Sequence, residues 1–190
     1  MNEQIIEAAK NYLKEIFKDN SDGHDEQHSL RVYHNALEIA ENYPECNKQI
    51  VALASLLHDV DDHKLFNTTN NMNARTFLKK NNVDDADIEM ICEIIGGVSF
   101  SKNRGNHPES IEGKIVQDAD RLDAMGAIGI ARTFAYGGKN GRPLESSLQH
   151  FHDKLLLLKD EMNTEEAKQS AEKRHAYMEG FLAEFSRETD

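Results

Sequence analysis

Apolar side chains recur along nearly the whole chain at the three- and four-residue spacing of a helix. No stretch of four or more residues alternates cleanly between apolar and polar positions. This pattern predicts α-helices rather than strands, and we expect an all-α fold, one bundle of about six to eight helices. The helical segments that it predicts are residues 2–17, 26–42, 47–60, 74–80, 84–95, 114–136, 144–159 and 164–185.

One predicted helix, residues 47–60, is apolar on nearly every face, because it contains the run from Ile50 to Leu57. Such a helix belongs at the centre of a protein. Two other segments are polar. Residues 61–73 are rich in asparagine and predict a loop, and residues 99–113 have almost no apolar side chain, which predicts an exposed, mobile loop before the long helix 114–136.

The composition fits a single globular domain over residues 1–190. The chain has 190 residues, of which 38% are hydrophobic and 29% charged, and it shows no internal repeat. A folded chain of this length removes roughly 70% of its surface from water, so the core needs no disulfide or oligomer to support it. The two cysteines, Cys46 and Cys92, have no CxxC spacing. This argues against a zinc ribbon or a disulfide framework and favours a reducing cytoplasm.

Charge and hydropathy narrow the possible partners. The 22 basic and 34 acidic residues give a formal net charge of −12, which repels polyanions and argues against general binding of duplex nucleic acid. The longest apolar stretches run to about ten residues, half of what crosses a bilayer, and the first residues do not resemble a signal peptide. We therefore expect a cytoplasmic protein with no membrane partner.

Candidate chemistry begins with His58 and Asp59, which stand at the end of the most apolar helix. Burying an imidazole and a carboxylate is costly unless they are paired or bound to a metal. Two interpretations stay open for this dipeptide alone. It is either part of a metal site, or a core histidine bonded to a carbonyl followed by an aspartate that caps the next turn.

A second candidate lies on the predicted helix 114–136, where one otherwise apolar face carries Asp120 and Asp123. The positions on this face follow one another at steps of four and three, and they are Val116, Asp120, Asp123, Ala127, Ile130 and Phe134. An acid on a core-facing stripe needs a cationic partner. That partner is either a metal ion or a buried arginine, such as Arg31 or Arg121.

A third candidate, His28, shares its helix face with Val32, Ala36 and Ile39 and is also expected to point inward. Two imidazoles and two carboxylates from three helices form a mixed nitrogen and oxygen set that suits Mn²⁺, Fe²⁺, Co²⁺, Ni²⁺ or Zn²⁺. Four protein ligands on a six-coordinate ion leave two positions for water and substrate. Hydrolysis of phosphate esters is therefore the expected reaction class.

Three pieces of sequence carry these residues in a fixed order, namely His28-Ser-Leu-Arg31-Val32, then His58-Asp59, then Asp118-Ala-Asp120-Arg121-Leu-Asp123. They resemble the H…HD…D signature of the HD-domain metal-dependent phosphohydrolases, and the chain is similar to small bacterial HD proteins of the YedJ type. The resemblance covers about residues 20–180. It implies a single HD-type helical domain.

The resemblance also implies roles for individual residues. His28, His58, Asp59 and Asp120 would hold one divalent metal ion, with Mn, Fe, Co, Ni, Zn and Mg all open. Asp62 lies where some members of the family place an acid that orients the attacking water.

Two further roles follow from position along the chain. Asp123 is a second candidate for positioning the attacking water. Arg31 and Arg121, each close in sequence to a candidate ligand, are the expected phosphate-binding residues. Their alternative is a salt bridge to Asp25, Asp118 or Asp123.

The favoured function is a metal-dependent phosphohydrolase, a phosphatase or phosphodiesterase, that acts on a small phosphorylated metabolite such as a nucleotide. A catalytically silent sensor that binds a metal and a nucleotide is the main alternative, and a purely structural helical domain without metal is a third. The expected partner is the small phosphorylated substrate, and a homodimer stays open.

Overall fold

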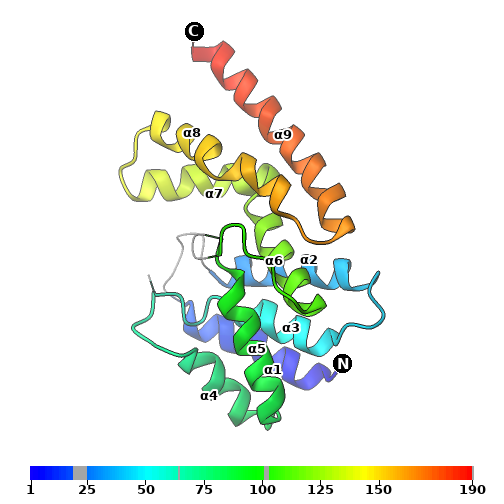
Figure 1. The fold of residues 1–190 in the computed structure, drawn as a ribbon. Coiled ribbons are helices and arrows are strands. Elements are labelled where there is room, and N and C mark those ends of the chain that lie inside the picture. Colours follow the sequence, from blue (N-terminus) through cyan, green and yellow to red (C-terminus); the bar gives the residue numbers. More distant parts are fainter. Residues whose placement is uncertain (19–24, 64, 101–102, 190) are drawn as a thin grey trace.

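The computed structural model describes residues 1–18, 25–63, 65–100 and 103–189 (Figure 1). Within these ranges there are nine α-helices, one 3-10 helix and no strand, so the all-α prediction is confirmed. None of the described helices is both long and apolar enough to cross a lipid bilayer. The elements are α1 (Glu3–Ile16), α2 (Glu26–Ala40), α3 (Lys48–Leu57), α4 (Met72–Lys80), α5 (Asp85–Val98), α6 (Ile111–Asp123), α7 (Gly126–Lys139), α8 (Leu144–Asp153), η1 (Leu155–Glu161) and α9 (Glu165–Thr189).

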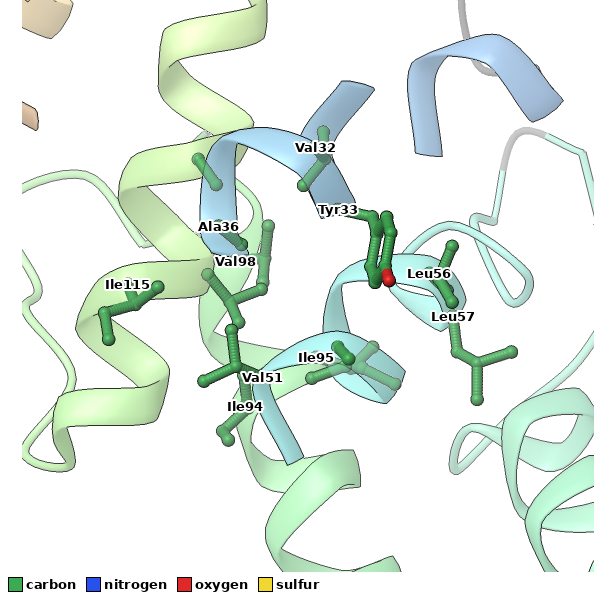
Figure 2. Close-up of a cluster of buried hydrophobic side chains, with 14 of the residues drawn as sticks. Val32, Tyr33, Ala36, Val51, Leu56, Leu57, Ile94, Ile95, Val98 and Ile115 are labelled. Carbon is green, nitrogen blue, oxygen red and sulfur yellow. The ribbon is translucent and has the colours of Figure 1, made fainter. Parts of the chain in front are cut away.

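Helix α3 forms the centre of the core, as its uniformly apolar sequence predicts. Every residue from Ile50 to Leu57 is buried, and the helix packs against α1, α2, α5 and α6. Figure 2 shows Val51 of α3 among side chains of α5 and α6, including Ile94 and Ile115. This packing fixes the C-terminal end of α3, where His58 and Asp59 follow.

The helices form two groups along the molecule. Helices α1 to α6 pack together at one end, while α7, α8 and η1 lie at the other, with the C-terminal part of α9 extending away (Figure 1). Asp118 of α6 joins the groups. Its buried carboxylate accepts hydrogen bonds from the backbone N–H groups of Asn163 and Thr164 at 2.8 and 2.7 Å, and from both their side chains. The start of α9 is thereby anchored on α6.

The predicted helix 114–136 is wrong, because the structure has two helices there. Helix α6 begins at Ile111 and ends at Asp123, and α7 begins at Gly126. Between them Met125 is extended, and Gly126 has a φ of +66°, which favours glycine. Asp120 and Asp123 therefore lie on a different helix from the apolar residues of α7, and the predicted continuous stripe does not exist.

Other boundaries also differ from the prediction. Helix α8 ends at Asp153, and the chain continues as the 3-10 helix η1 rather than as one helix to residue 159. Helix α5 runs through Gly96 and Gly97 to Val98. The predicted exposed loop 99–113 is partly ordered against the core: Phe100 is buried, and the Ser110 hydroxyl accepts a hydrogen bond from the Gly113 N–H to cap α6.

Candidate metal centre and pocket

Three helices bring the four predicted metal ligands together. His28 lies in the first turn of α2, which begins where the Asp25 carboxylate accepts a hydrogen bond from the His28 N–H at 2.8 Å. His58 and Asp59 follow the buried end of α3, and Asp120 comes from α6. Both histidines and Asp59 are buried, which requires strong compensating interactions.

The candidate ligand atoms converge on one point. His28 Nε2 lies 3.1 Å from His58 Nε2, 3.3 Å from Asp120 Oδ1 and 3.4 Å from Asp59 Oδ2. His58 Nε2 lies 3.4 Å from Asp59 Oδ2 and 3.7 Å from Asp120 Oδ1. Atoms that share one ion at about 2.1 Å stand about 3 to 4 Å apart. The cluster of His28, His58 and Asp120 is therefore consistent with binding of a metal ion. Asp59 Oδ2 lies 3.4 Å from the Nε2 atom of each histidine.

Protein groups behind the histidines fix the orientation of both rings. His28 Nδ1 lies 2.7 Å from Asp123 Oδ2, and His58 Nδ1 lies 2.8 Å from the Ser55 carbonyl oxygen. Both partners are acceptors, so each Nδ1 donates its hydrogen and each Nε2 is directed at the cluster. Histidines that bind metals are held in this way by acceptors on the other nitrogen. The orientation of both rings, as well as the distances between the ligand atoms, therefore fits a divalent metal ion.

The protonation of His28 follows from its acidic surroundings. Burial lowers the pKa of this imidazole, but hydrogen bonds to Asp120, Asp123 and Asp59 outweigh burial and raise the pKa to about 10. The cluster thus attracts positive charge strongly. A divalent cation bound in place of the proton would offset the charge of the same carboxylates, and its binding would release protons.

Asp123 lies behind His28 and does not line the pocket described below. Its carboxylate accepts hydrogen bonds from Arg31 Nε at 2.6 Å and Arg132 Nη1 at 2.6 Å. Burial raises its pKa, but the hydrogen bonds from His28 and Arg31 outweigh burial and hold the pKa well below its usual range. The expected water-positioning role does not agree with this placement, since all described partners of the carboxylate are cationic side chains that it holds in place.

The two arginines expected to bind phosphate have protein partners instead. Arg31 pairs with Asp123, one of the alternatives left open by the sequence. Arg121 is fully buried, where it donates to the Glu161 carbonyl oxygen and lies over the Phe100 ring. Neither residue lines the pocket. The difference arises because consecutive residues of a helix point in different directions, so Arg121 faces away from the cluster that its neighbour Asp120 joins.

A pocket of about 440 Å³ opens beside the cluster, and its volume is in the range of small-molecule sites. His58, Asp59 and Asp120 form part of its wall, together with Asp62. Asp61 also faces the pocket, but its carboxylate accepts hydrogen bonds from the N–H groups at the start of α4. The Asp61 carboxylate therefore caps the start of α4.

Sequence reasoning missed the basic side chains of this pocket. They come from α7, the α7–α8 loop, α8 and the residue before η1, and they are Arg132, Arg142, His150 and Lys154. These residues come after the break at the end of α6, where the chain changes direction. Their distance along the sequence from the candidate ligands therefore does not predict that they line the same pocket. His150 is half-buried at the pocket.

Comparison with known proteins identifies the family. Residues 26–125 match the model of the HD domain, so the chain belongs to the HD domain family, as its signature predicts. It is 39% identical over 191 residues to the protein YpgQ of Bacillus subtilis, covering 96% of this chain and 92% of YpgQ.

Solved structures show the same similarity over nearly the full length. An HD-superfamily hydrolase from Bacillus thuringiensis has 42% sequence identity and a TM-score of 0.80, covering 98% of this chain and 97% of that protein. The structure of B. subtilis YpgQ in complex with ADP aligns with 34% identity and a TM-score of 0.81, covering 96% and 97% of the two chains.

Proposed function

We propose that this protein is a metal-dependent phosphohydrolase that acts on a small phosphorylated metabolite, with a nucleotide as the favoured substrate. The observation that carries the proposal is the position of the His/Asp cluster, which forms the wall of a pocket that also holds basic side chains. Carboxylates and imidazoles that converge at ion-binding distances meet the need of a metal, and nearby cations meet the charge of a phosphate.

His28, His58, Asp59 and Asp120 are the residues proposed to hold the ion. When bound, a divalent ion supplies Lewis-acid polarisation of a phosphoryl oxygen and lowers the pKa of water. The remaining work belongs to the chain itself. We assign Asp62 to orient the attacking water and accept its proton, since this carboxylate lines the pocket three residues after Asp59.

Arg132 is the proposed phosphate-binding residue in place of Arg121. Arg132 lines the pocket, and its Nη1 donates to Asp123 at 2.6 Å and lies 3.0 Å from His28 Nδ1. The Asp123 carboxylate therefore fixes Arg132 close to the candidate ligands, where a guanidinium offsets the charge of a phosphoryl group. Arg31 supports the arrangement from the other side of Asp123.

Two observations favour a nucleotide. The relative YpgQ has been crystallised with ADP. The pocket of this chain has aromatic rings, Phe100 and Tyr136, beside its basic groups, which suits a ligand with both a ring system and phosphates. A nucleotide is therefore the first substrate class to test.

The test measures metal content and product formation from ADP with Mn²⁺, Fe²⁺, Co²⁺, Ni²⁺, Zn²⁺ or Mg²⁺. We expect Asp59→Asn to lose both metal and activity. Asp62→Asn should keep its metal but lower kcat about a hundredfold or more, the typical contribution of a general base. Asp160→Asn, an exposed change of the same kind on η1, is the matched control.

Binding and turnover assays of the metal-loaded protein also separate the proposal from the sensor alternative. ADP binding by the metal-loaded protein with no product from ADP or other phosphate esters, under any of the metals, would establish a sensor. Full activity in Asp59→Asn would rule out the metal-site mechanism.

A further inference from the structure

The pocket has a second charged region besides the His/Asp cluster. Arg142, His150 and Lys154 all line it, and they come from the α7–α8 loop, from α8 and from the residue between α8 and η1. Three basic groups from adjacent elements thus meet in one pocket of a chain whose net charge is −12. Concentrated positive charge of this kind favours an anionic ligand.

Aromatic rings hold two of these cations in position. The Arg142 guanidinium carbon lies 5.3 Å from the centre of the Tyr136 ring, and Lys154 Nζ lies 5.4 Å from the centre of the Phe100 ring. A cation over a ring face is attracted by the ring quadrupole but keeps its full charge. Both side chains are only partly exposed, so their charges are less screened than those of a solvated surface.

The third basic side chain of this region, His150, is affected by the charges of the other two. His150 is half-buried and lies one helical turn before Lys154. Burial lowers its pKa, and the charges of Lys154 and Arg142 lower it further, while Asp153 acts in the opposite direction. His150 is therefore near both cations at the pocket, and a bound anion would offset their charges.

This region is separate from the proposed phosphate contact at Arg132. Arg132 and Tyr136 are one turn apart on α7, about 6 Å along the helix, and Arg142 lies over Tyr136 beyond the end of that helix. The match to the HD domain ends at residue 125, before all of these residues. The second region thus belongs to the part of the chain that the family signature does not cover.

We propose that Arg142, His150 and Lys154 form a second anion subsite, which binds an anionic group of the substrate other than the phosphate at the His/Asp cluster. The inference rests on the proposed function and narrows its substrate class. A metabolite with two or more phosphate groups fills both regions of the pocket, whereas one with a single phosphate leaves the second subsite unfilled.

The test compares ADP with AMP as probes of the metal-loaded protein, by calorimetric titration. We expect Arg142→Gln/Lys154→Gln to weaken ADP binding at least about tenfold, since each lost contact is a hydrogen bond to a charged group. AMP binding should change less than about twofold. The matched control is Lys79→Gln/Lys80→Gln, two exposed lysines of α4, which changes the net charge equally and should leave both affinities unchanged.

Metal content and far-ultraviolet circular dichroism check that the double variant keeps the cluster and the fold. If it does not fold, Arg142→Gln alone replaces it, with an expected loss of about threefold or more for ADP.

Three outcomes would overturn the subsite: unchanged ADP affinity, equal weakening of ADP and AMP, or no ADP binding by the parent protein. All three outcomes are binding measurements, so none of them requires the protein to convert ADP to product. A protein that binds ADP through the subsite but forms no product would overturn the enzyme proposal alone.

Discussion

Each histidine of the cluster is defined by what its second nitrogen touches. Ser55 and Asp123 accept hydrogen bonds from the Nδ1 atoms of His58 and His28, so the two Nε2 atoms meet at 3.1 Å. The carbonyl of Ser55 is a backbone group that no side-chain substitution removes. Asp123 is a side chain and can be changed, which makes it the place to test how much ring orientation contributes.

Asp123→Asn should weaken metal binding about 10- to 100-fold, the usual effect of losing a partner behind a metal-bound histidine. The amide has nearly the same shape but carries no charge for Arg31, Arg132 and the Nδ1–H of His28. Competition with a chelator measures the affinity. Asp62→Asn, which changes a pocket carboxylate outside this network, should leave metal affinity within about twofold, and similar losses in both variants would refute the positioning role.

Sequence alone predicts which residues meet in the cluster but not which groups form hydrogen bonds to them from the far side. His58 and Asp59 are recognisable because they follow a wholly apolar helix, and His28 because it lies on an apolar face. The partner of Asp123 could not be chosen, since Arg31, Arg121 and a metal all satisfied the same rule that a buried acid needs a cation. Only the fold shows that Arg31 and Arg132 reach it while Arg121 does not.

Among the elements, the break between α6 and α7 has the greatest effect on the site. The apolar spacing continues across it in phase, so periodicity predicts one helix where the backbone forms two. The sequence feature that marks this break is glycine. Gly126 takes the positive φ, and Gly129 packs so tightly against the turn that an added Cβ would lie 2.2 Å from the Ala124 carbonyl oxygen.

Gly129→Ala should therefore destabilise the protein by about 1–3 kcal/mol, because the new methyl group overlaps backbone that has little room to move. Gly138→Ala on the same helix is the control: its Cβ would meet nothing within 4 Å, and alanine favours helix, so stability should stay equal or rise slightly. Urea unfolding of the two variants gives the comparison. Equal stability in both would show that the α6–α7 turn tolerates a side chain.

At the scale of the whole molecule, the candidate ligands tie together helices that are distant in the sequence. The cluster spans α2, the end of α3 and α6, all of which pack around the same core. An ion held there binds the folded chain and not the unfolded one, and it therefore stabilises the fold by mass action.

Metal added at about 100 times its dissociation constant should raise the free energy of unfolding by about 2.7 kcal/mol. The measurement is Tm with and without metal, followed by removal of the metal with a chelator, which should return Tm to its starting value. Asp59→Asn should show no such shift. A shift of equal size in that variant would place the metal elsewhere on the chain.

The pocket wall is shared between the chain before and the chain after the break at Gly126. The acidic wall comes from the segment that matches the HD domain, and the basic wall from the helices that follow it. Under the proposed function, the metal ligands and the second anion subsite would come from consecutive stretches of the chain. Exchange of residues 126–163 between relatives is therefore a direct way to redesign the basic wall while the acidic wall stays unchanged.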